Sequence, residues 1–165
     1  MTTTPDVEQA AARELAREAL ATASPDELPI LDETADLYFD DPAAALAPGR
    51  GEGTVGFGLE LALLGPFIVH AAVAAVRWLA SVVADSAQEE GAEAVRAGVK
   101  ALIGRLAGRH PDPSTAPHAL ALSDADVARL RAVTRSSATS AGLDEARAGL
   151  VADAVVGALL RPAAT

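Results

Sequence analysis

The most distinctive pattern in the chain is a long apolar run near its middle. The sixteen residues from Leu61 to Val76 contain one histidine and no charged side chain, and the apolar character resumes after Arg77. Proline is tolerated in the first turn of a helix, so Pro66 predicts a helix that starts near Gly65 and continues to Ala84. Such a helix is about 30 Å long, which is close to the thickness of a bilayer core.

Two interpretations of the apolar segment 59–84 stay open. In the first, the helix associates with a membrane; in the second, it is the core of a soluble bundle, apolar on all sides because other helices surround it. Glu60, Arg77 and the internal Pro66 weaken the membrane interpretation. In either case the side chains expected to contact lipid or partner helices are Leu61, Leu64, Phe67, Ile68, Val69, Val73, Val76, Trp78, Val82 and Val83.

A polar stripe is expected on the same helix. His70 and Arg77 are seven residues apart, which places them on one face. This stripe would either line a pore or meet acidic side chains of another helix.

An amphipathic pattern follows over residues 86–108. Glutamates come early in this segment and basic residues come late, which suits the helix dipole. Its apolar positions recur at helical spacing, at Val95, Val99, Leu102, Ile103 and Leu106. We expect an amphipathic helix that packs against the apolar helix as a hairpin, with a membrane surface as the alternative location.

The C-terminal pattern predicts a helical hairpin over residues 123–162. Ser123 and Asp126 nearly match a capping box at the first helix, and Ser136–Ser140 are expected to fray its end. A turn at Gly142 leads into a second helix that Pro162 terminates. Its buried face is predicted to comprise Leu150, Val151, Ala154, Val155, Ala158 and Leu159.

The N-terminal pattern predicts two or three helices with little apolar surface. The first spans 6–22 and has a thin, alanine-rich face, so we expect it to be loosely docked. Ser24, Pro25 and Glu27 resemble a capped helix start, and a short helix is expected over 32–39.

Together these patterns predict an all-α protein, a small helical bundle with a central apolar helix, an amphipathic helix and a C-terminal helical hairpin. The expected organisation is an acidic helical region at 1–48, a glycine-rich hinge at 49–58, the apolar and amphipathic helices at 59–108, a proline-rich linker at 109–122 and the hairpin at 123–162.

Charge is distributed very unevenly along the chain. Residues 1–60 hold thirteen acids and three bases and so account for the whole net charge of −10, whereas the remaining residues hold ten of each. Seven of the acids lie between Asp26 and Gly49. A patch that meets a basic partner and a solvated face that aids solubility are the two explanations, and we favour the second.

Composition excludes several classes of protein. The chain has no cysteine, which rules out disulfides and thiolate metal sites. Nucleic-acid binding is disfavoured because there is no basic face and aromatic residues make up only 3%. The first twenty residues do not resemble a cleaved secretory signal, so we expect a membrane-associated or cytoplasmic location. The alanine-rich composition is typical of GC-rich bacterial genomes.

No constellation of residues indicates catalysis. Gly51–Gly56 matches G-x-G-x-x-G but follows no strand, so nucleotide binding is not expected. His110, Asp112 and His118 lie in the proline-rich linker, which makes a poor metal site. We therefore expect no enzyme, no cofactor and no metal.

The leading functional hypothesis is a small non-enzymatic protein, effector- or anchor-like, that associates with a membrane by inserting its apolar helix. Its expected partners are a membrane or partner helices. The alternative is a permanently soluble helical adaptor or interaction module in which the same helix is the core, with a homo-oligomer as one form.

Overall fold

A computed structural model of the chain describes residues 5–47, 63–85 and 122–161. These residues form an all-α bundle without a strand, which confirms the predicted fold class. The elements are α1 (Pro5–Ala23), the 3₁₀ helix η1 (Pro25–Ile30), α2 (Leu31–Asp40), α3 (Pro42–Ala45), α4 (Gly65–Asp85), α6 (Asp124–Ser140) and α7 (Glu145–Leu160). The predicted hinge 49–58, the amphipathic helix 86–108 and almost all of the linker 109–122 lie outside the described residues.

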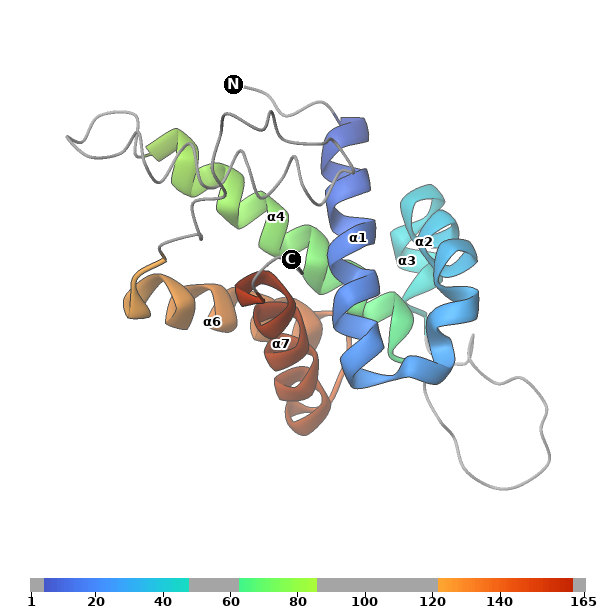
Figure 1. Cartoon of the computed structure of the whole chain (residues 1–165). Helices are drawn as coiled ribbons and strands as arrows, with labels where there is room; N and C mark the ends of the chain where they lie inside the picture. Colours follow the sequence, from blue (N-terminus) through green and yellow to red (C-terminus); the bar gives the residue numbers. More distant parts are fainter. Residues whose placement is uncertain (1–4, 48–62, 86–121, 162–165) are drawn as a thin grey trace.

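Helix α4 is the centre of the bundle. It packs against α1, α2, α6 and α7, and Figure 1 shows it crossing behind α1. It begins at Gly65 with Pro66 in its first turn, as predicted. Its buried residues join those of the other helices in one hydrophobic cluster, and on α4 they are Ile68, Val69, Ala71, Ala72, Val73, Ala75, Val76 and Leu79.

The N-terminus of α4 is held by a side chain that lies far away in the sequence. Glu27 of η1 accepts hydrogen bonds from the backbone N–H groups of Leu64 at 3.0 Å and Gly65 at 2.8 Å. Both are amides that a helix start leaves without intrahelical partners, and the carboxylate also suits the helix dipole. A Cβ at Gly65 would lie 3.2 Å from Glu27 Oε2, so glycine permits this close approach.

The expectation that α1 is loosely docked is wrong. Six of its alanine and leucine side chains are fully buried, and the helix packs against α4 and α7; the six are Ala11, Ala12, Leu15, Ala16, Ala19 and Leu20. Small side chains bury little area each, but they let helices approach closely, and a contiguous face of them sums to a substantial contact.

The predicted helix start after Ser24 is confirmed, with Pro25 as the first helical residue, but the predicted side-chain cap is wrong. The segment after Ser24 is a 3₁₀ helix, and Ser24 makes no side-chain cap to it. Instead, its hydroxyl donates a hydrogen bond of 2.8 Å to Glu27, which orients the carboxylate toward α4. The short helix expected over 32–39 is confirmed as α2.

Helices α6 and α7 form the predicted C-terminal hairpin (Figure 1). Ser123 and Asp126 make a complete capping box, and the turn uses Gly142 at φ 108°, where glycine avoids a steric penalty. Two details differ from the prediction. Helix α6 continues through Ser140 without fraying at Ser136, and Leu150 lies on the outer face of α7.

Candidate functional site

Two polar residues of α4, His70 and Arg77, are paired with side chains from α2 and α1. Tyr38 Oη and His70 Nδ1 lie 2.7 Å apart and share a hydrogen bond, with the rings in an edge-to-face arrangement. Two turns further along α4, Arg77 Nε donates a hydrogen bond of 2.6 Å to Glu8 of α1. His70 and Arg77 therefore each contact another helix of the same chain, and the acid that meets Arg77 is Glu8 of α1.

Burial shifts the pKa values of His70 and Tyr38. It lowers the pKa of His70 below its ordinary value of 6.5, and the positive charge of Arg77 acts in the same direction. Burial also raises the pKa of Tyr38 above 10.0, which Arg77 partly opposes. At neutral pH both side chains are therefore uncharged, and the hydrogen bond joins a phenol to a neutral imidazole.

The residues predicted to contact lipid or partner helices fall into three groups. Ile68, Val69, Val73 and Val76 are buried inside the bundle. The partly buried group comprises Leu64, Phe67, Trp78 and Val82. Leu61 and the side chain of Val83 lie outside the described residues. The most apolar face of α4 therefore contacts helices of its own chain.

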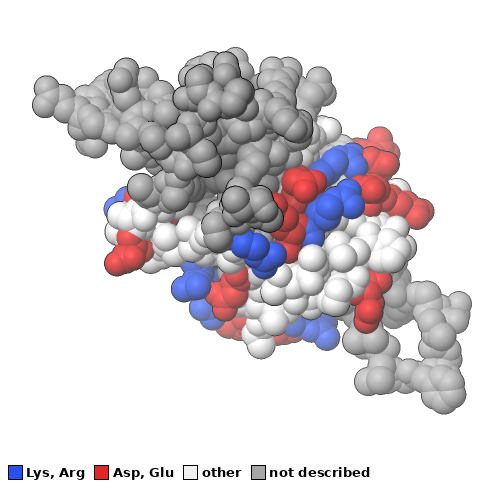
Figure 2. All heavy atoms as spheres, viewed as in Figure 1, with Lys and Arg blue, Asp and Glu red and all other residues white. Residues whose placement is uncertain are grey.

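Much of the acidic segment 26–49 is used within the fold. Glu27 holds the start of α4 and Asp41 caps α3, accepting from the Ala44 N–H at 2.9 Å. Asp32 and Asp36 pair with Arg17 and Arg13 of α1, and the Arg13 guanidinium also lies over the ring of Phe39. Figure 2 shows acidic and basic side chains interleaved on the visible face.

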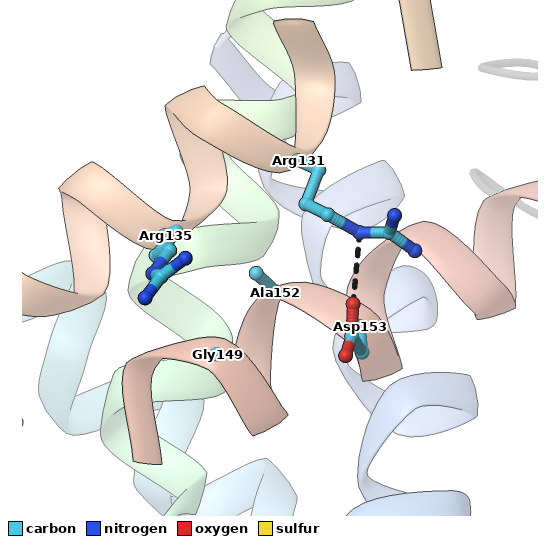
Figure 3. Close-up of a pocket in the computed structure, with 5 residues that line it drawn as sticks. All are labelled: Arg131, Arg135, Gly149, Ala152 and Asp153. Atoms are coloured by element: carbon cyan, nitrogen blue, oxygen red, sulfur yellow. Dashed lines mark ion pairs between the residues drawn. The ribbon is translucent and has the colours of Figure 1, made fainter. Parts of the chain in front are cut away.

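A shallow hollow of about 260 Å³ lies between α6 and α7. Arg131 and Arg135 of α6 flank it, and Gly149, Ala152 and Asp153 of α7 form its floor (Figure 3). Arg131 Nε pairs with Asp153 at 2.8 Å, and Arg135 pairs with Glu145. Both guanidinium groups therefore have an acidic partner within the chain.

The described residues offer little that resembles catalytic or metal chemistry. Within residues 5–47, 63–85 and 122–161, no three His, Cys, Asp or Glu side chains converge as metal ligands. His110, Asp112 and His118 lie outside these ranges.

No family model, no curated protein and no solved structure matches the chain.

One helix of the described residues is long and apolar enough to cross a membrane. The qualifying window is Gly65–Val82 of α4, and half of it is buried inside the bundle. A core helix of a soluble protein has the same length and composition.

The sequence identified His70 and Arg77 but not their partners Tyr38 and Glu8, and it marked Glu27 only as part of a local helix start. Nothing local indicates these contacts, because the paired residues are 32, 69 and 37–38 positions apart along the chain. The available signal was indirect: an acid-rich N-terminal region beside a helix that carries an arginine and needs an N-terminal cap.

Proposed function

We propose that this chain is a soluble helical interaction module that works through contacts of its bundle surface, with α4 as its permanent core and no catalytic role. The observation that supports this most directly is the pairing of His70 with Tyr38 and of Arg77 with Glu8. A helix that carries polar groups into a bilayer needs them satisfied by other membrane-embedded groups or by a pore.

Withdrawal of α4 from the bundle would carry a large cost. It would break both polar pairs and the contacts of Glu27 with Leu64 and Gly65, and it would expose the buried faces of α1 and α7. The helices that supply the partners carry many exposed acids, which do not enter a bilayer readily. These considerations favour a helix that stays inside.

A second candidate function is membrane association by insertion of α4, as an effector or an anchor. The length and apolar composition of Gly65–Val82 favour it. In this mechanism the surrounding helices shield α4 until it meets a membrane.

Two aspartate substitutions in α4 separate the candidates. Val73 is buried in the bundle, whereas Ser81 is exposed on the same helix. If α4 is a core helix, Val73→Asp abolishes cooperative unfolding, because an unpaired buried carboxylate costs more than about 4 kcal/mol. Ser81→Asp should leave the melting temperature almost unchanged.

The measurement combines thermal melts with fractionation of the full chain expressed in bacteria, including high-salt and carbonate washes of the membranes. If α4 is a permanent core helix, wild-type protein and Ser81→Asp should both be recovered in the soluble fraction as monodisperse species. Wild-type protein retained in carbonate-washed membranes, and released by either aspartate, would establish the second candidate instead.

A further inference from the structure

His70 of α4 has a hydrogen-bond partner but no counter-ion. Its Nδ1 lies 2.7 Å from Tyr38 Oη of α2, and the histidine is half-buried. Among the residues that the structure describes, no carboxylate lies within ion-pair distance of its ring. A proton on His70 would therefore add a positive charge that no anion beside it neutralises, which is unfavourable away from water.

The charged groups on the helices around α4 do not supply that anion. The helices packed against α4 are α1, α2, α6 and α7. Helix α1 contributes Glu8, but this carboxylate is bonded to Arg77, whose positive charge acts with burial to lower the pKa of His70. The other ion-paired groups of these helices contact one another, and the pairs are Glu14 with Arg17, Asp32 with Arg17, Asp36 with Arg13, Asp126 with Arg129, Asp144 with Arg147, Asp153 with Arg131 and Glu145 with Arg135.

Helices α2 and α3, which together span residues 31–45, are attached to the bundle through few buried side chains. They lie at one edge of the molecule in Figure 1. Helix α2 buries Leu31, Ala35 and Tyr38, whereas no residue of α3 is buried. The ion pairs that join α2 to α1 are largely solvent-exposed, and such pairs contribute little to stability. A unit with so few buried contacts opens at a lower free energy than the whole bundle.

We propose that the contact between Tyr38 and His70 is a pH-sensitive latch, which holds α2 and α3 on α4 at neutral pH and releases them when His70 takes up a proton. The helices α1, α4, α6 and α7 stay packed during this release, since they share most of the core. The inference goes beyond the proposed function, because it adds an acid-dependent change of shape to the soluble bundle.

The chemistry of the two rings gives the latch its direction. A neutral imidazole can accept or donate at Nδ1, whereas an imidazolium can only donate there. The phenol oxygen of Tyr38 can accept that hydrogen bond, but it does not neutralise the charge. Release of α2 exposes the His70 ring to water, which solvates the cation.

The sign of the pH dependence follows from the two protonation equilibria. His70 has a lower pKa in the closed state than its ordinary value of 6.5, so a proton favours the open state. The open population therefore rises as the pH falls through 6.5, and it stops rising below the pKa of the closed state. A single proton changes the opening constant by at most about tenfold for each pH unit.

The test is hydrogen exchange of the full chain followed by mass spectrometry at about pH 7.5 and about pH 5, with rates corrected for the intrinsic effect of pH. On acidification, protection over residues 31–45 should fall at least about threefold more than protection over α7. His70→Asn cannot titrate, so this difference should disappear. His118→Asn is the matched control, because it removes a histidine outside the described residues and should behave like wild-type protein.

Tyr38→Phe adds a readout at constant pH. It keeps the ring but removes the hydroxyl that contacts His70, so residues 31–45 should lose protection at pH about 7.5 while α7 does not. An equal loss of protection over α2 and α7 on acidification, or the same selective loss in His70→Asn as in wild-type protein, would overturn the latch. Either result leaves the soluble interaction module standing, whereas retention of wild-type protein in carbonate-washed membranes would overturn the proposed function.

Discussion

At the scale of single residues, burial lowers the pKa of His70. The imidazole faces Tyr38 of α2 and shares its side of α4 with Arg77, which is itself paired with Glu8 of α1. The lowered pKa of His70 means that protonation is disfavoured in the folded state relative to the unfolded chain. His70 therefore links the stability of the bundle to pH.

The sign of this linkage can be tested with His70→Asn, which keeps a polar atom near the position of Nδ1 but does not titrate. Below the ordinary pKa of 6.5 the unfolded chain binds a proton at His70 before the folded chain does. Acidification through that value therefore lowers wild-type stability, and the loss ends once the pH is below the folded pKa.

We expect wild-type protein to lose more unfolding free energy than His70→Asn between about pH 7.5 and about pH 5, as measured by urea denaturation. The two proteins contain the same carboxylates, so the comparison isolates the contribution of His70. Parallel losses in the two proteins would show that His70 is not linked to folding.

At the scale of elements, the start of α4 depends on a residue of η1. Gly65 and Pro66 predicted the position of this start, because the residues that begin and end a helix are recognisable locally in the sequence. It did not predict the cap, because Glu27 reaches α4 only after the chain has folded. The helix-end signal at Ser24 fails in a similar way, because its hydroxyl donates to the Glu27 side chain instead of accepting from a backbone N–H of η1.

Glu27→Ala tests this long-range cap. Loss of an N-terminal cap typically costs about 0.5–2 kcal/mol, and here two backbone N–H groups lose their acceptor together. Glu33→Ala is the control, since Glu33 is an exposed acid on α2 and its removal should change stability by less than about 0.5 kcal/mol. Equal changes in the denaturation midpoint for the two variants would argue against the cap.

At the scale of the whole molecule, the acidic and neutral parts of the chain share one core. Periodicity predicted the helices but not which helices pack together. The alanine-rich face of α1 suggested weak packing, because the sequence does not show the surface that it contacts. The same limit explains Leu150, whose apolar character predicted burial within the chain, whereas it lies outside the core. The acidic N-terminal part of the sequence is therefore not a separate region, because it supplies helices that pack against α4.

Leu15→Ala tests whether this shared core unfolds as one unit. Leu15 lies on α1 in the acidic region and is fully buried, so its truncation should cost about 2–5 kcal/mol. Trp78, the one tryptophan in the chain, lies on α4 and reports on the other region through its fluorescence. Because α1 packs against α4 and α7, the fluorescence and far-UV circular dichroism transitions should shift together in urea. Ile30→Ala, at an exposed position on η1, should shift neither by a comparable amount. If α1 instead folded apart from α4, Leu15→Ala would leave the Trp78 transition in place and split the two probes.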